Sequence, residues 1–349
     1  MKPRAGATSC AAEASVPTDR HAAGGLPAID ADLLDVLRRT AEIETQSASW
    51  KLPEAERRRL VSERAAAMLP RASEPGVERT DLYAVSAGRE IPIRLYRRAG
   101  GDAARAPLML YAHGGGWVVG SIATHDTLCA ELAACTGHAV ASVHYRRAPE
   151  HPHPAQHEDL WEAGDWLLRH ARALGLDGDS PMAVAGDSAG AHLALGVAWR
   201  AQRQTPGRYG RQLLFYPALD PGLGSDSVRL YADGPGLTRA AMQYYWRSLL
   251  GEDATGDAHR AALPMRWQGS ELALPPTVLV TAETDVLRDE GEAFASRLLA
   301  AGVPLRHWRA DGMIHGFARM LAASAAARAH VRRACEAFVE LGGGTPALR

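Results

Sequence analysis

The sequence predicts an α/β fold in which a mostly parallel sheet is covered by helices on both faces. Three observations lead to this prediction. Short apolar runs bounded by turn residues alternate along the chain with stretches of helical periodicity. Several of these runs read as buried strands, as expected for a sheet covered on both faces. The chain has 349 residues and 46% hydrophobic composition, which is enough to bury a large core in one domain.

The first part of the chain reads as a tail followed by two helices. Residues 1–27 are rich in Ala, Gly and Ser and are expected to be disordered, with no apolar segment typical of an export signal. Residues 29–44 repeat apolar side chains at helical spacing, and residues 53–69 form a second helical pattern with Pro53 in its first turn. Residues 28–75 are therefore expected to be a separate helical element.

The remaining residues, 76–349, contain the predicted sheet. Residues 80–87 and 90–97 alternate in polarity around Gly88, which predicts an antiparallel hairpin. Apolar runs then predict strands at 107–112, 139–145, 182–186, 212–216, 277–282 and 304–309. Helical patterns lie near 155–172, 190–202, 289–301 and 322–340. This alternation is typical of βαβ units, whose strands run parallel.

Charge and composition exclude several classes of partner. The formal net charge is −1 without a long run of like charge, so the basic surface of a nucleic-acid-binding protein is not expected. No apolar run approaches the roughly 20 residues needed to span a bilayer. The four cysteines form no CxxC pair, which favours reduced thiols and a cytoplasmic location. We expect a small-molecule substrate; a homodimer is compatible with a sequence that does not disclose the oligomeric state.

One serine stands in a run of very small residues. Gly186-Asp187-Ser188-Ala189-Gly190 follows a predicted strand and precedes a predicted helix, which is the context of a GxSxG nucleophile elbow. A nucleophile on such a turn has a strained backbone, and side chains at the flanking positions would collide with the strand and helix. An ordinary glycine-rich turn is the alternative interpretation of the pentapeptide taken alone.

A second glycine-rich motif, HGGGW at residues 113–117, directly follows another predicted strand. Three consecutive glycines allow backbone N–H groups to turn toward a ligand, and such a loop provides donors to an oxyanion hole, which the N–H of Ala189 would complete. A phosphate-binding loop is the competing interpretation, but neither GxGxxG nor GxxxxGK[ST] is present.

A serine nucleophile requires a base and an acid that orients the base, in the chain order Ser, Asp or Glu, His. Asp285 lies just beyond the strand at 277–282, where α/β sites assemble, and Glu283 is the second candidate. His315 follows a strand on a Gly-flanked loop and is favoured as the base, whereas His307 lies inside a predicted strand and reads as a packed side chain. Asp289 and Glu290 open the next helix and are explained by capping.

Together these motifs resemble one family. HGGGW, YRRAPE at residues 145–150, GDSAG, the segment DVLRDEG from Asp285 and GMIHGF are similar to the bacterial branch of the hormone-sensitive lipase family, the family IV esterases of the α/β-hydrolase superfamily. The resemblance extends from about residue 28 to about residue 340. The chain departs from the family's usual pattern at Arg147, His153, Ala191 and Val286, and none of these departures removes a catalytic group.

The resemblance implies an eight-stranded α/β-hydrolase sheet and a serine carboxylesterase for short- to medium-chain esters, which needs neither metal nor organic cofactor. It implies Ser188 as nucleophile, His315 as base and Asp285 as orienting acid, with Gly115, Gly116 and Ala189 as oxyanion donors. It also implies a cap from residues 28–75 and a second segment near 220–255. Four side chains are candidates for the substrate pocket, with plain core packing as the equal alternative for the last three: Trp117, Met242, Tyr245 and Trp246.

Three alternatives stay open beside this hypothesis. In the string from His151 to His157, the H-x-H spacing of His151 and His153 would put two imidazoles on one side of an extended segment, as metal ligands require, although the intervening prolines also suit the turn that begins a helix. An amidase or deacetylase of a specialised metabolite would use the same triad. A non-catalytic receptor on this fold is a third class, but Ser188 and its two predicted partners are all present.

Overall fold

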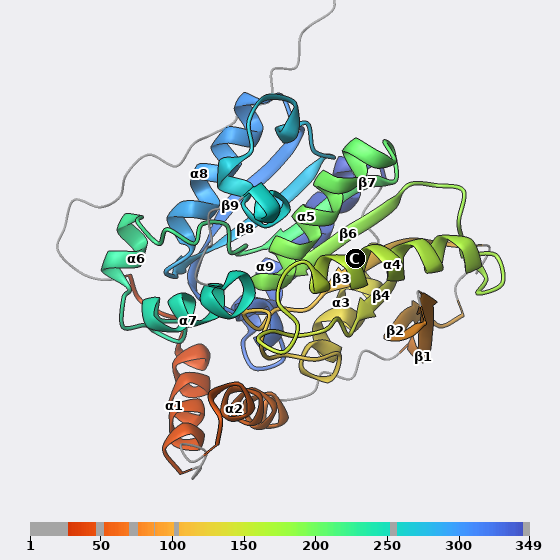
Figure 1. Cartoon of the computed structure of the whole chain (residues 1–349). Coiled ribbons are helices and arrows are strands. Elements are labelled where there is room, and N and C mark those ends of the chain that lie inside the picture. The colour runs from red at the N-terminus through yellow and green to blue at the C-terminus, as the bar shows by residue number, and fades with distance from the viewer. Residues whose placement is uncertain are drawn as a thin grey trace, which may run out of the picture.

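The fold is a single twisted sheet with helices on both faces and a helical pair at one end (Figure 1). The computed structural model describes residues 27–46, 52–69, 76–86, 88–100, 105–251 and 257–344. All but the last residue of the predicted tail, 1–27, lies outside the described residues. The architecture is that of an α/β-hydrolase fold, as the sequence predicted.

Among the described residues the sheet has nine strands, of which eight form one continuous order, β1-β2-β4-β3-β6-β7-β8-β9. The antiparallel hairpin β1–β2 lies at one edge, β2 pairs antiparallel with β4, and all later pairs are parallel. The short β5 pairs only with the start of β3. The strands are β1 (Val77–Ser86), β2 (Arg89–Arg98), β3 (Ala106–Ala112), β4 (Ala139–Val143), β5 (Leu176–Asp177), β6 (Met182–Asp187), β7 (Tyr209–Phe215), β8 (Thr277–Thr284) and β9 (Leu305–Ile314).

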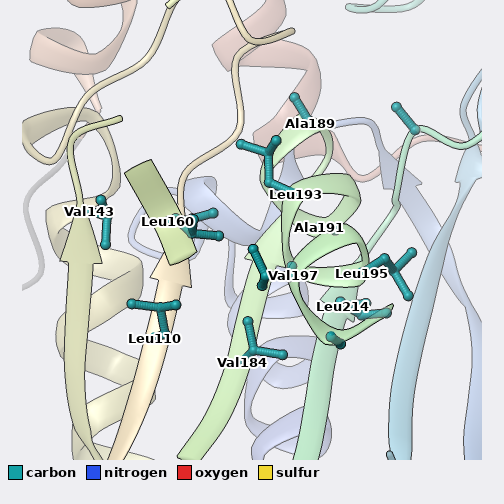
Figure 2. Packing of buried hydrophobic residues seen from close by; sticks show 14 of the residues in the cluster. Leu110, Val143, Leu160, Val184, Ala189, Ala191, Leu193, Leu195, Val197 and Leu214 are labelled. Atoms are coloured by element: carbon teal, nitrogen blue, oxygen red, sulfur yellow. The ribbon is translucent and has the colours of Figure 1, made fainter. Parts of the chain in front are cut away.

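Helices cover both faces because alternate residues of the central strands point to opposite sides. On one face, Leu110 of β3 and Val184 of β6 pack with α4 (Ala155–His170), α5 (Ala189–Gln204) and α8 (Arg288–Ala300). Figure 2 shows α5 lying over this face, with Leu193 and Val197 among the apolar side chains between helix and sheet. On the other face, the intervening residues pack against α3 (Asp126–Thr136) and α9 (Ala325–Leu341).

Four further helices lie near the ends of the parallel strands. The N-terminal helical pair, α1 (Ala31–Gln46) and α2 (Glu54–Met68), extends from one end of the molecule, at the bottom of Figure 1. Between β7 and β8 the chain forms α6 (Asp226–Leu230) and α7 (Arg239–Leu250). Short 3₁₀ turns complete the connections: η2 (Ala123–His125), η3 (Asp257–Ala262), η4 (Pro264–Arg266), η5 (Gly269–Leu272) and η6 (Phe317–Met320).

A small apolar cluster joins α2 and α7 to the body. Val118, Val119 and Ala148 are buried, and Ala55 of α2 packs on them together with Tyr244 and Tyr245 of α7. Since Val118 and Val119 directly follow the HGGGW motif, both helices contact the loop that we predicted to supply oxyanion donors. The fold therefore brings the two helical segments and the glycine loop to one place.

Candidate active site

Ser188 lies on the turn between β6 and α5, at the carboxyl end of a central parallel strand. Its backbone has φ 53° and ψ −122°, a left-handed conformation that a non-glycine residue rarely adopts. Its N–H donates to the Phe215 carbonyl at 2.8 Å, which holds the turn against β7. The turn presents the serine side chain to the active-site cavity described below, while the residue itself is only 7% exposed.

The small residues around Ser188 are required by close approach of the backbone. A Cβ atom on Gly190 would lie 2.0 Å from the carbonyl oxygen of Ala112, and one on Gly186 would lie 2.4 Å from the carbonyl carbon of Gly190. Both obstacles are main-chain atoms of the sheet or helix, which cannot move aside easily. The glycines thus let α5 start directly against β3, which fixes the position of the serine.

The three side chains predicted as nucleophile, base and acid form one hydrogen-bonded chain. His315 Nε2 is 2.8 Å from Ser188 Oγ, and His315 Nδ1 is 2.7 Å from Asp285 Oδ2. The backbone N–H of Leu287 donates to Asp285 Oδ1 at 3.0 Å and so fixes the carboxylate. The Asp285 side chain is fully buried, whereas 12% of the His315 side chain is exposed toward the cavity. This arrangement lets the imidazole take a proton from the serine while the carboxylate orients the ring.

The competing candidates lie elsewhere and have other partners. Glu283 accepts a hydrogen bond from the Gly312 N–H at 2.7 Å. His307 is half-buried within β9, as a packed side chain should be. Asp289 accepts from the Ser227 N–H at 2.6 Å and so ties α8 to α6.

Glu290, the other acidic residue in the first turn of α8, is buried and also binds the backbone of the segment after β7. It accepts a hydrogen bond from the Leu219 N–H at 2.7 Å. Burial raises the pKa of its carboxyl well above the ordinary value. The capping explanation from sequence therefore covers only part of its role.

Residues of the glycine loop line the cavity beside Ser188. Gly115, Gly116 and Ala189 all contribute to its wall. None of their N–H groups donates a hydrogen bond within the part of the chain that the structure describes. Ala189 is also the first residue of α5, so the positive end of the helix dipole points to the same place. Three free donors next to a serine oxygen fit the requirements of an oxyanion hole.

Asp187, the variable residue of the GxSxG motif, anchors this loop and was missed from the sequence. Its Oδ1 atom accepts from the Gly114 N–H at 2.8 Å and from the Tyr111 hydroxyl at 2.6 Å, and His125 Nε2 lies 3.3 Å from it. Burial raises the pKa of this carboxyl, but His125 and the two hydrogen bonds outweigh burial and hold the pKa below its ordinary value. Asp187 is therefore an anion buried under the loop.

Two arginines hold the outer side of the same loop. Arg147 donates to the Gly120 carbonyl at 2.9 Å, and Arg59 of α2 donates to the Val118 carbonyl at 3.4 Å. Arg59 also forms an ion pair with Glu150 at 2.5 Å. Arg147 is one of the departures from the family pattern noted above, and its contact shows that this departure adds a hydrogen bond to the loop. Arg59 links α2 to that loop directly.

The cavity above Ser188 has a volume of about 260 Å³. The N-terminal helical pair forms one wall, with Val36 and Leu37 of α1 and Arg58 of α2. The body provides the opposite wall through the glycine loop and the segment that follows His315. A pocket of this size, mostly apolar and ending at a nucleophile, is suited to a small organic substrate.

Three of the four pocket candidates line this cavity: Trp117, Met242 and Tyr245. The Tyr245 ring lies directly on the loop, since a Cβ atom on Gly116 would lie 2.3 Å from it. The structure places Trp246 outside the wall of the cavity. It is buried against the Trp117 ring, 4.4 Å away between centroids, and packs on His192.

The histidine string at residues 151–157 contributes to a group of rings of which His157 and His192 are buried. His153 and His157 lie 5.0 Å apart between centroids, and the group continues to His192 and His259. Across the described ranges, His, Cys, Asp and Glu side chains nowhere gather in threes in a way that could hold a metal ion. The described helices are all too short or too polar to cross a membrane.

Comparison with known proteins places the chain among ester hydrolases. A family model described as the alpha/beta hydrolase fold matches residues 109–319. Esterase LipI of Mycobacterium tuberculosis is 40% identical over 218 residues, covering 62% of this chain and 67% of that protein. The ethyl acetate hydrolase of Pseudomonas putida is 35% identical over 267 residues, covering 76% and 83%. The crystal structure of a thermostable esterase from Pseudomonas putida ECU1011 has a TM-score of 0.79 and 30% identity, covering 90% and 99%.

The fold, the Ser188 turn and these similarities define the chain as a hydrolase of the α/β-hydrolase fold. It belongs to the hormone-sensitive lipase-like branch of that family, and its relatives include proteins named esterase and carboxylic ester hydrolase. The chain spans about two thirds of the length of several curated relatives that it matches.

Proposed function

We propose that this protein is a serine carboxylesterase that hydrolyses short- to medium-chain carboxylic esters through an acyl-enzyme intermediate. The observation that supports this most directly is the hydrogen-bonded chain Ser188, His315 and Asp285, with distances of 2.8 and 2.7 Å. The names of its relatives, among them an ethyl acetate hydrolase, support a small ester as the substrate.

The proposed first half of the reaction forms the acyl-enzyme. His315 Nε2 takes the proton of Ser188 as Oγ attacks the ester carbonyl carbon. The negative charge that develops on the carbonyl oxygen is stabilised by the N–H groups of Gly115, Gly116 and Ala189. The C–O bond to the alcohol then breaks, and the imidazolium of His315 protonates the departing alcohol oxygen.

Hydrolysis of the acyl-enzyme repeats these steps with water. His315 removes a proton from the attacking water, a second tetrahedral intermediate forms on the same donors, and the carboxylic acid leaves as Ser188 regains its proton. Asp285 stays ionised throughout and stabilises the imidazolium. All these groups belong to the body of the molecule.

The wall provided by α1, α2 and α7 supports a further proposal, that these helices form a cap that selects the substrate. Val36 and Leu37 of α1 and Met242 and Tyr245 of α7 supply apolar surface to the cavity, and α2 adds Arg58 and Ser62. A chain-length series of p-nitrophenyl esters measures the depth of this pocket. We expect kcat/KM to fall steeply once the acyl chain exceeds the space between Ser188 and these side chains.

Substitution of the serine tests the proposed nucleophile. Ser188→Ala removes the nucleophilic oxygen, so hydrolysis of p-nitrophenyl acetate should fall by several orders of magnitude while thermal unfolding stays close to that of the wild type. A fluorophosphonate probe should label the wild type and leave Ser188→Ala unlabelled. Full turnover by the folded variant would exclude Ser188 as the nucleophile.

We also propose a cytoplasmic location and a homodimer. The buried thiols Cys129, Cys135 and Cys335 are free, which supports a reducing compartment; Cys10 lies outside the described residues. Tyr83 and Val85 are exposed on the edge strand β1, which supports association at that edge. Light scattering after size exclusion measures the mass, and a monomer at all accessible concentrations would contradict the homodimer.

A further inference from the structure

Arg319 occupies the boundary between two cavities. It lies in η6 (Phe317–Met320), four residues after the proposed base His315. Its side chain lines the active-site cavity and also a second cavity of about 280 Å³ beside it. The second cavity is bounded by α2 and by the start of α3, including Glu63, Ser121 and Thr124. The guanidinium is therefore part of the space that a substrate would enter.

The Arg319 side chain is half-buried, yet it makes no hydrogen bond or ion pair within the described ranges. Other arginines around the site are engaged: Arg59 with Glu150, Arg147 with the Gly120 carbonyl, and Arg288 with Asp289. A guanidinium has five donors and keeps its charge at any physiological pH. No nitrogen of this guanidinium is sealed off from solvent, so its donors are accessible to an acceptor that a ligand brings into the cavity.

Two arginines, Arg58 and Arg319, line the active-site cavity. Arg58 lies on the opposite wall, with its guanidinium 4.4 Å from the Tyr244 ring centroid. Asp187 is the one carboxylate among the described residues that line the cavity, and its acceptor oxygen is already occupied by Gly114 and Tyr111. A substrate in this cavity therefore meets the guanidinium groups of Arg58 and Arg319 and one carboxylate that already accepts two hydrogen bonds.

The charge of Arg319 acts on two tyrosines that pack against the proposed active site. Burial raises the pKa of the Tyr216 and Tyr245 phenols, and the Arg319 charge acts on both in the opposite direction. The Tyr216 ring packs on the proposed base His315 at 4.8 Å between centroids, and Tyr245 covers Gly116 of the glycine loop. An anion held by Arg319 would therefore lie next to an ester positioned on Ser188.

We propose that Arg319 binds a carboxylate of the substrate, so that the preferred esters carry a free carboxylate on either the acyl or the alcohol side. This inference rests on the proposed esterase function and names the substrate class of the same site. The planar guanidinium matches a carboxylate in a bidentate, charge-assisted hydrogen bond. Binding energy from this remote group would position the ester carbonyl against Ser188.

Matched pairs of esters test the proposal. Monoethyl glutarate against ethyl pentanoate places the carboxylate on the acyl side, and 3-acetoxypropanoate against propyl acetate places it on the alcohol side. We expect kcat/KM of the wild type to be at least tenfold higher for the charged member of one pair, and the pair that responds identifies the side that faces Arg319. Equal rates for both members of both pairs would overturn the inference and leave the esterase function intact.

Substitutions identify the residue responsible. Arg319→Gln should abolish the preference for the charged ester, mainly through KM, and Arg319→Lys should keep part of it because the charge remains while the bidentate geometry is lost. Arg172→Gln is the matched control, since Arg172 is 75% exposed, pairs with Asp179 and lines neither cavity. A folded Arg319→Gln variant that keeps the full preference would overturn the assignment.

A measurement on the wild type alone keeps the proposal testable if the variants fail to fold. Glutarate should inhibit hydrolysis of ethyl pentanoate competitively, and high ionic strength should weaken the inhibition because salt screens the ion pair. Absence of competitive inhibition, or inhibition that is insensitive to salt, would count against a carboxylate site. A folded wild type that hydrolyses no ester, charged or neutral, would instead refute the proposed function itself.

Discussion

At the residue scale, the groups proposed to do the chemistry could be chosen from sequence because each had a motif and a place relative to a predicted strand. Ser188, Asp285 and His315 all follow strands of one parallel sheet, so their side chains meet at the same edge. Asp187 was missed because the GxSxG motif leaves its position free. The available signal was its position: a carboxylate at the end of a buried strand has little access to water and therefore needs a buried hydrogen-bond partner.

Asp187 gives the first prediction at this scale. Asp187→Ala removes the acceptor of the Gly114 N–H and the Tyr111 hydroxyl, and leaving both unpaired should destabilise the protein by about 1–3 kcal/mol for each group. The glycine loop loses its anchor, so we expect kcat for p-nitrophenyl acetate to fall about 10²-fold, as when an oxyanion donor is lost.

Asp187→Asn is the graded control for this prediction, because it keeps an acceptor oxygen and should lose less activity than Asp187→Ala. Steady-state kinetics and urea unfolding of both variants provide the comparison. Wild-type kcat in a folded Asp187→Ala variant would show that the loop does not depend on this carboxylate.

At the element scale, helices and strands were predictable in kind and less so at their ends. The helix predicted at 53–69 is α2 (Glu54–Met68), and the strand predicted at 304–309 continues as β9 to Ile314. The residues beyond 309 include Gly312 and Asp311, which read as a loop. Pairing with β8 extends the strand past an irregularity to Thr284↔Ile314, and this tertiary contact is not visible in local sequence.

The junction of α5 with β3 gives the prediction at this scale. Gly190→Ala would place a Cβ atom 2.0 Å from the Ala112 carbonyl oxygen, so helix or strand must shift, and we expect a loss of about 3 kcal/mol or more in unfolding free energy. Gly224→Ala is the control, since a Cβ there meets nothing within 4 Å, and its effect should stay within about 0.5 kcal/mol. Equal stability of the two variants would contradict the packing described for the turn.

At the scale of the whole molecule, the fold class followed from sequence but the strand order did not. Alternating patterns indicate a parallel sheet, yet nothing local shows that β3 lies between β4 and β6, or that the hairpin β1–β2 joins at β4. Which strands lie next to each other depends on how helices pack on both faces of the sheet, and that packing involves residues from α3 to α9. The second cavity, which Arg319 shares with the active-site cavity, could not be foreseen for the same reason. It is formed by residues of α2, residues at the start of α3 and Arg319, which are far apart in the sequence.

Buried imidazoles predict how the whole molecule responds to acid. Burial lowers the pKa of His192 to about 3 and of His138 to about 4, and it holds the pKa values of His113 and His157 well below the ordinary value. The unfolded chain, with histidines near 6.5, then binds more protons than the folded state. Stability should be complete above pH 6.5 and fall below it, by about 1.4 kcal/mol per pH unit for each such histidine.

Urea unfolding at several pH values between 7 and 5 measures this loss. His157→Gln should reduce the slope, because glutamine does not titrate and neither ring nitrogen of His157 has a hydrogen-bond partner within the described ranges. The exposed His151→Gln serves as the control and should leave the slope unchanged. A midpoint that stays constant from pH 7 to pH 5 would contradict the prediction.

The walls of the cavity come from different parts of the chain, which has a practical consequence for redesign. Every atom proposed to take part in bond making belongs to residues between 113 and 315, whereas the pair formed by α1 and α2 supplies one wall through a few side chains, among them Val36 and Arg58. If α1 and α2 are replaced by the corresponding helices of a homologue, we expect the substrate preference to change while the proposed catalytic residues stay the same. The part of the selectivity that comes from these two helices could then be exchanged without altering the catalytic residues.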